Sequence, residues 1–98
     1  MDQYRFQNSA EFDDIFNQLI QQEKLSFEWI KTKWNLSTQK TKILLRESEL
    51  YRDDEFLMNV LSELRLEEEP PTISRIMGKY RVSYPLAEKI FGMYMEDC

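Results

Sequence analysis

Hydrophobic residues recur at helical spacing in two separate stretches of the chain. The first stretch comprises Phe12, Ile15, Phe16, Leu19 and Ile20. The second comprises Phe56, Leu57, Val60, Leu61 and Leu64. Acidic residues lie near the start of each stretch, as is typical of a helix N-terminus, so the pattern predicts helices over about 10–23 and 54–65. Only two glycines and three prolines interrupt the whole chain, and long helices are therefore expected.

Each predicted helix is followed by a copy of the same twenty-residue pattern. The copies read SFEWIKTKWNLSTQKTKILL (residues 26–45) and TISRIMGKYRVSYPLAEKIF (residues 72–91), and an offset of 46 residues aligns them. This offset pairs Ile30 with Ile76, Leu36 with Val82, Ser37 with Ser83, Thr41 with Ala87 and Leu44 with Ile90. The agreement indicates that one structural unit occurs twice in the chain.

Within each copy the pattern predicts a short helix, a three-residue break and a further helix. The breaks read NLS and RVS, and each contains one aliphatic residue of the kind that is usually buried. Ser37 or Ser83 can then accept a hydrogen bond from a free N–H group of the next helix. Thr41 or Ala87 is small enough to let that helix cross its predecessor closely. These features are typical of a helix-turn-helix, and a generic helical bundle with short loops is the alternative.

The repeat extends to the helices that precede the two copies. Their hydrophobic positions align by pairing Ile15 with Phe56 and Leu19 with Val60. We therefore expect two three-helix units, residues 1–50 and 51–98, packed as one compact domain. The predicted fold class is all-α, with about six helices in tandem helix-turn-helix units. No wing or only a minimal one is expected, because few residues follow either third helix.

Charge is distributed unevenly along the chain. The whole sequence has a net charge of −5, which by itself argues against a nucleic-acid partner. Residues 26–46, however, contain five basic residues and one acidic residue, for a net charge of +4, and residues 73–98 have a net charge of +1. The negative charge lies in residues 1–25 and 47–72. Both copies of the repeated pattern are therefore positive, as a site for double-stranded DNA requires.

Other functional classes lack the residues that they need. The chain has no histidine, and its single cysteine, Cys98, is the last residue, so no internal disulfide is expected. The acidic residues show no ligand spacing and no phosphate-binding glycine loop occurs, so we expect no metal, no cofactor and no enzymatic activity. No apolar run approaches the roughly 18 residues of a membrane span. Residues 1–10 are polar and do not form a signal peptide, so a cytoplasmic protein is expected.

The predicted DNA-binding surface consists of donors and cations on the two copies. The residues expected to reach base edges, at the start of the first copy's third helix, are Thr38, Gln39, Lys40 and Lys42. Those expected to reach the DNA backbone are Lys31, Lys33, Arg46, Arg75, Lys79, Arg81, Tyr84 and Lys89. The simpler interpretation is a solvated amphipathic helix whose lysines only keep its outer face in water.

The second copy also resembles a known family. The stretch ISRIMGKYRVSYPLAEKI is similar to the C-terminal gamma domain of the FtsK/SpoIIIE chromosome translocases. The matching or similar positions are Ile73, Ser74, Ile76, Lys79, Tyr80, Arg81, Val82, Tyr84, Ala87, Lys89 and Ile90. This resemblance implies a winged-helix fold that binds double-stranded DNA and reads a short oriented sequence through its third helix. The first copy resembles the same pattern faintly.

Two functions are consistent with these patterns. The first is a small double-stranded DNA-binding protein, a regulator or DNA-organising factor, for which a homodimer is also considered because one helix-turn-helix rarely binds tightly alone. The alternative is an acidic adaptor or inhibitor of the phage or plasmid type that binds a partner protein. Its binding surface would be acidic or rich in methionine and tyrosine. The residues that favour this alternative are Tyr4, Phe6, Tyr51, Tyr84, Tyr94, Met77, Met93 and Met95.

Overall fold

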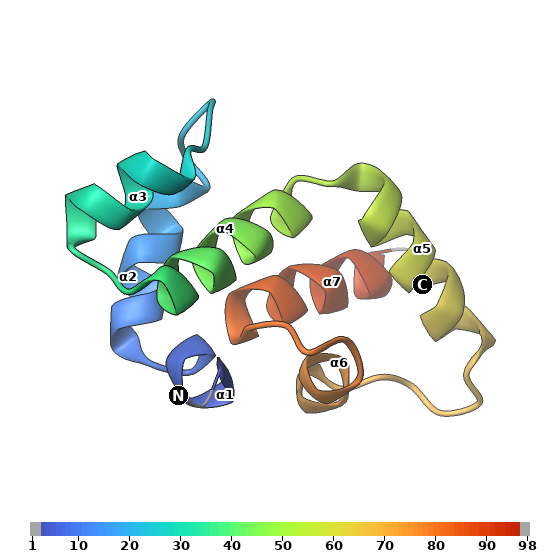
Figure 1. The fold of residues 1–98 in the computed structure, drawn as a ribbon. Coiled ribbons are helices and arrows are strands. Elements are labelled where there is room, and N and C mark those ends of the chain that lie inside the picture. Colours follow the sequence, from blue (N-terminus) through green and yellow to red (C-terminus); the bar gives the residue numbers. More distant parts are fainter. Residues whose placement is uncertain (1–2, 97–98) are drawn as a thin grey trace.

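The computed structural model describes residues 3–96, and this part of the chain contains seven α-helices and no strand (Figure 1). The helices are α1 (Gln3–Gln7), α2 (Ala10–Leu19), α3 (Phe27–Trp34), α4 (Thr38–Tyr51), α5 (Asp54–Leu66), α6 (Ile73–Tyr80) and α7 (Tyr84–Glu96). The all-α prediction is confirmed, and α1 is added to the six helices that were expected. None of the seven helices is long and apolar enough to cross a lipid bilayer.

The two copies of the repeated pattern have the same backbone conformation at the same offset. Ser26 and Thr72 cap α3 and α6, because the hydroxyl of each accepts a hydrogen bond from the N–H three residues ahead. Both short helices end on a residue in the left-handed conformation, Asn35 with φ of 51° and Arg81 with φ of 54°. That conformation redirects the chain, so that α4 and α7 begin at equivalent positions, three residues later.

Burial repeats in the two copies as well. Both members are buried in four of the pairs that the 46-residue offset aligns, namely Ile30 and Ile76, Leu36 and Val82, Thr41 and Ala87, and Leu44 and Ile90. The aliphatic residue of each break thus lies in a core, and a small residue stands where the third helix crosses the second. Residues 27–51 and 73–96 therefore each form a helix-turn-helix.

The N-terminal cap of the third helix is formed in only one of the two units. Ser37 Oγ accepts a hydrogen bond from the N–H of Lys40 at 3.1 Å, as predicted. The prediction that Ser83 does the same is wrong, because its Oγ has no hydrogen-bond partner among the residues described. Pro85 in the first turn of α7 lacks an N–H group to donate. The backbone N–H of Ser83 instead donates to the side chain of Glu47, at 2.8 Å.

The first helices of the two units align differently from the sequence-based pairing. In α2 the buried residues are Phe12, Ile15, Phe16 and Leu19. In α5 they are Leu57, Val60, Leu61 and Leu64. These sets match at an offset of 45 residues, which pairs Ile15 with Val60 and leaves Phe56 half-buried at the edge. The pairing of Ile15 with Phe56 is therefore wrong, because it is displaced by four residues, about one helical turn, from the pairing that the buried residues define.

Each unit has its own hydrophobic core, and the two cores lie side by side in an elongated molecule of 44 × 28 × 17 Å. Helix α1 belongs to the first core, where the ring of Phe6 packs edge-on against Phe12 with ring centroids 5.4 Å apart. Phe6 was expected at an exposed position, and its burial is a correction. Tyr51, at the end of α4, contacts both cores. Helix α4 therefore links the two units.

The third helices of the two units, α4 and α7, are in direct contact and run in the same direction (Figure 1). The start of α7 meets the middle of α4 through the bond between Ser83 and Glu47. One and a half turns further along α7, the ammonium of Lys89 donates to the carbonyl of Tyr51 at 2.7 Å. These two polar contacts join the units across the line where α4 and α7 pack.

Candidate nucleic-acid interface

The opening turns of α4 present polar side chains to solvent. Thr38, Gln39 and Lys42 are exposed, whereas Thr41 and Leu44 on the opposite face are completely buried. Lys42 lies four residues after Thr38 and three after Gln39, so all three side chains lie along one side of the helix. The start of a recognition helix is the part that contacts base edges in a helix-turn-helix complex. The structure therefore leaves this part of the predicted DNA-binding surface open.

Two other cations of α4 are held by groups of the protein itself. Lys40 Nζ lies 2.9 Å from Glu11 Oε1 on α2, which makes it an ion-pair partner rather than a free donor. Arg46 Nη1 lies 3.2 Å from Glu47 Oε2 and donates to the carbonyl of Arg81 at 3.3 Å. Both residues were predicted to contact DNA. In this structure they hold α4 against α2 and against the turn between α6 and α7.

Lys31 and Lys33 lie on different sides of α3. A separation of two residues on a helix corresponds to a rotation of about 200° around its axis. The two side chains therefore lie on opposite sides of the buried stripe that contains Ile30. Within residues 3–96 neither lysine forms an ion pair with a carboxylate. The two lysines therefore do not form a single cationic face on α3.

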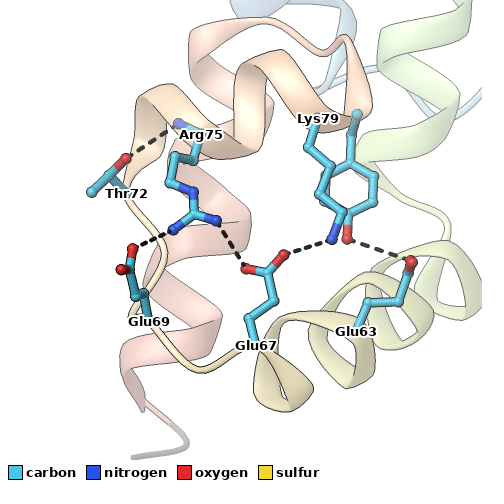
Figure 2. A network of polar contacts seen from close by, with 7 residues as sticks. Glu63, Glu67, Glu69, Thr72, Arg75 and Lys79 are labelled. Atoms are coloured by element: carbon cyan, nitrogen blue, oxygen red, sulfur yellow. Dashed lines mark hydrogen bonds and ion pairs between the residues drawn. The ribbon is translucent and has the colours of Figure 1, made fainter.

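The cations of α6 are neutralised by the linker that precedes this helix (Figure 2). Lys79 Nζ lies 2.7 Å from Glu67 Oε1, and Arg75 lies 3.9 Å from the other oxygen of Glu67 and 3.3 Å from Glu69. The hydrogen bond from Lys79 lowers the pKa of Glu67, and the same bond raises the pKa of Lys79. The acidic linker thus occupies the side of α6 that was predicted to contact phosphates.

The remaining candidates of the second unit lie in different environments. Lys89 is half-buried, with its ammonium 3.9 Å from the centroid of the Tyr51 ring, and desolvation by burial lowers its pKa. Tyr84 and Arg81 are exposed. Leu86, in the first turn of α7, is completely buried. The second unit consequently offers few free donors at the start of its third helix.

Glu47 is the most buried charged residue of the part of the chain that is described, and the sequence-based search did not identify it. Its Oε1 accepts from the N–H of Ser83, and its Oε2 accepts from Gln7 Nε2 and Arg46 Nη1, each at 3.2 Å. Burial raises the pKa of Glu47, although the backbone hydrogen bond from Ser83 opposes that rise. The available signal was its position four residues after Ile43, which places it on the same side of α4 as that buried residue.

The contact between α4 and α7 limits how the two units can bind a duplex. Successive major grooves on one face of B-DNA are about 34 Å apart, whereas packed helices have axes about 8–10 Å apart. The Ser83–Glu47 hydrogen bond shows that α4 and α7 are in such contact. The two third helices therefore cannot enter two successive grooves at once. In this arrangement at most one of the two helices could enter a major groove.

The tyrosines that were predicted to form a protein-binding surface are mostly half-buried or have side chains outside the described part of the structure. Tyr51 and Tyr94 are half-buried, and Tyr84 is the exposed member of the tyrosines whose side chains are described. The side chain of Tyr4 and the whole of Cys98 lie outside the described part. Among residues 3–96 no group of histidine, cysteine, aspartate or glutamate side chains could hold a metal ion.

Comparison of the chain with protein-family models, curated proteins and solved structures finds no match.

Proposed function

We propose that this protein binds double-stranded DNA through the opening turns of α4. The observation that carries the proposal is the exposed set of Thr38, Gln39 and Lys42 on the third helix of a helix-turn-helix. Glutamine is suited to adenine, lysine to guanine or phosphate, and threonine to a thymine methyl group. Among the described residues, Lys42 forms no ion pair with a carboxylate and is free for such a contact.

The corresponding positions of α7 favour a supporting role for the second unit. The 46-residue offset replaces Thr38 by Tyr84, Gln39 by Pro85 and Lys42 by Glu88, so this helix lacks both the amide and the cation. The resemblance of residues 73–90 to the gamma domain supports the same class of partner, with the reading helix in the other unit. Since one helix-turn-helix rarely binds tightly alone, a second copy of the chain would contact the second half-site.

Lys42→Ala and Gln39→Ala are expected to weaken duplex binding in different ways. Removing the Lys42 cation should lower the salt dependence by about one counterion and weaken binding to all sequences alike. Removing the Gln39 amide should cost about 1–3 kcal/mol on the preferred sequence only. The preferred sequence is first obtained by selection from random duplex DNA, and affinities are then measured by fluorescence anisotropy at two salt concentrations.

Lys24→Ala is the matched control, because Lys24 is exposed in the loop between α2 and α3. Its affinity for the duplex should equal that of the unaltered protein. If the unaltered protein shows no salt-sensitive binding to any duplex at low salt, the proposal is wrong.

The acidic linker is expected to oppose DNA binding by the second unit. The double variant combines Glu67→Gln with Glu69→Gln. In this variant Arg75 and Lys79 lose their carboxylate partners and become available to phosphates. We expect a severalfold gain in duplex affinity together with a steeper salt dependence. Glu68→Gln, an exposed neighbour without a recorded ion pair in the described region, is the control. Equal affinities of the double variant and the control would show that α6 stays away from the DNA.

An adaptor that binds a partner protein is the second candidate function. It is favoured by the large hydrophobic side chains that the second unit exposes, Met58, Leu66 and Met95, with Leu66 86% exposed. The neutralised cations of α6 fit this function as well, because a protein partner does not need them. Absence of DNA binding at low salt, combined with an intact fold, would favour the adaptor.

A further inference from the structure

The outer face of α3 carries an aromatic and cationic cluster made of Trp29, Lys33 and Trp34, which the duplex-binding surface on α4 does not use. The two indole rings meet edge to face with centroids 5.7 Å apart. Lys33 Nζ lies 5.0 Å from the centroid of Trp29 and 5.2 Å from that of Trp34. Trp34 also packs against the first core, and it therefore supports Trp29 from one side.

Trp29 is the unusual member of this cluster. Its side chain is 40% exposed, although burial of an indole ring is strongly favourable and the first core lies next to it. No carboxylate among the described residues neutralises Lys33. An exposed indole beside a free ammonium matches the two groups that single-stranded nucleic acid requires, namely a surface on which a base stacks and a cation for the adjacent phosphate.

The second unit contains a closed version of the same arrangement. Lys79 and Tyr80 occupy the positions of Lys33 and Trp34, and Lys79 Nζ lies 5.5 Å from the centroid of the Tyr80 ring. There the linker and the last turn of α5 cover the pair, because Glu67 of the linker binds Lys79 and Glu63 of α5 accepts from the hydroxyl of Tyr80 (Figure 2). The linker before α3 contains a single glutamate, Glu23, and leaves the first cluster open.

We infer that Trp29, Lys33 and Trp34 form a binding site for an unpaired nucleobase and its phosphate in single-stranded nucleic acid. The base stacks on the exposed ring of Trp29. Lys33, whose ammonium lies over the indole rings in the free protein, moves to the phosphate next to that base. Lys31, which like Lys33 forms no ion pair with a carboxylate among the described residues, adds positive charge to the same helix and favours the same polyanionic ligand. The site is distinct from the α4 surface and does not depend on duplex binding.

Tryptophan fluorescence tests this inference directly, because Trp29 and Trp34 are the two tryptophans of the chain. In a Trp34→Phe variant the signal comes from Trp29 alone. Titration with an oligo-dT strand of about ten nucleotides should give a saturable decrease in emission. Trp29→Ala should weaken binding of the labelled strand about 5- to 150-fold, as expected for the loss of one stacked base, and Trp29→Phe should restore part of it.

Lys33→Ala and Lys79→Ala provide the matched pair of variants. Lys33→Ala should weaken binding of the strand and reduce its salt dependence, whereas Lys79→Ala should leave both unchanged because Glu67 already neutralises that cation. Both side chains are exposed, so thermal unfolding is expected to be nearly the same for the two variants. Equal effects of the two variants would overturn the assignment to α3.

The outcomes also separate this inference from the proposed function. Binding of duplex DNA without any change in Trp29 emission upon addition of single strands would overturn the inference and leave the duplex proposal in place. Quenching of Trp29 emission by single strands, without duplex binding, would support the inference and overturn the duplex proposal. If Trp29→Ala binds the strand as tightly as the unaltered protein, the site is wrong even though single strands bind.

Discussion

Replacing Glu47 by methionine is expected to lower the free energy of unfolding by about 1–3 kcal/mol. Methionine stands at the equivalent position of α7, Met93, and its length is similar, so the main loss is polar. The N–H of Ser83, which is completely buried, would have no acceptor. Gln7 still donates to the carbonyl of Arg81, and Arg46 is half exposed, so neither is left in a buried unpaired state.

Two opposing effects determine the size of this loss. Replacing a buried ion by a hydrophobic side chain is often neutral or stabilising, because the ion no longer has to be desolvated. Here the unpaired N–H at the start of α7 outweighs that gain, since the bond from Ser83 holds the second unit against α4. Urea denaturation measures the difference, and Glu49→Met on the exposed side of α4 is the control, with an expected change within about 0.5 kcal/mol. Equal stability of the two variants would contradict the prediction.

The Glu47→Gln variant separates the charge of this residue from its hydrogen bonds. Burial raises the pKa of Glu47, so the folded state binds its proton more tightly than the unfolded chain does. The resulting contribution to stability is fully present below the ordinary glutamate pKa of about 4.3 and is lost as the pH rises through the folded-state pKa. As the pH rises through the folded-state pKa of Glu47, the unaltered protein should therefore lose stability relative to E47Q. A difference that is constant with pH would show that the carboxyl has an ordinary pKa.

Ile90→Ala is expected to destabilise the protein by about 2–5 kcal/mol, because the side chain is completely buried in the second core and its removal leaves a cavity. Leu44→Ala, at the equivalent position in the first core, should have a similar effect. Both substitutions should lower the melting temperature in one transition, since α4 packs against both α2 and α7 and Tyr51 contacts both cores.

The positions of the tryptophans make this prediction specific. Trp29 and Trp34 lie in the first unit, so fluorescence reports on that unit, whereas circular dichroism reports on all the helices. Ile90→Ala, in the second unit, should shift both signals to the same lower temperature. If it shifts only the circular dichroism and leaves the fluorescence transition unchanged, the two units unfold separately and the Glu47 contact does not couple them.

The local structure of both units could be predicted because it depends on residues that are close in sequence. Hydrophobic spacing placed six of the helices, and capping side chains such as Ser37 marked where a third helix begins. Two features were missed for the same physical reason. Helix α1 is short, and its packing through Phe6 depends on contacts with other helices. The alignment of α2 with α5 was displaced by about one turn, and placing it required knowledge of which residues the other helices bury.

The candidate site was predicted only in part, because the availability of a charged side chain depends on residues far away in the chain. Lys42 is free, as expected, but Lys40 is paired with Glu11, 29 residues earlier. Arg75 and Lys79, which were predicted to contact DNA, are paired with the linker. Net charge by segment correctly located the basic residues but could not show which of them are already neutralised.

The amino-acid sequence by itself determined that a helix-turn-helix occurs twice, because helical periodicity, the break between helices and the buried aliphatic residue are encoded locally. Only the tertiary structure decided that α4 and α7 pack together, that Glu47 joins the two units, and that the opening turns of α4 and the outer face of α3 remain open. These outcomes depend on desolvation and on partners brought together by folding, such as Glu47 and Ser83, 36 residues apart.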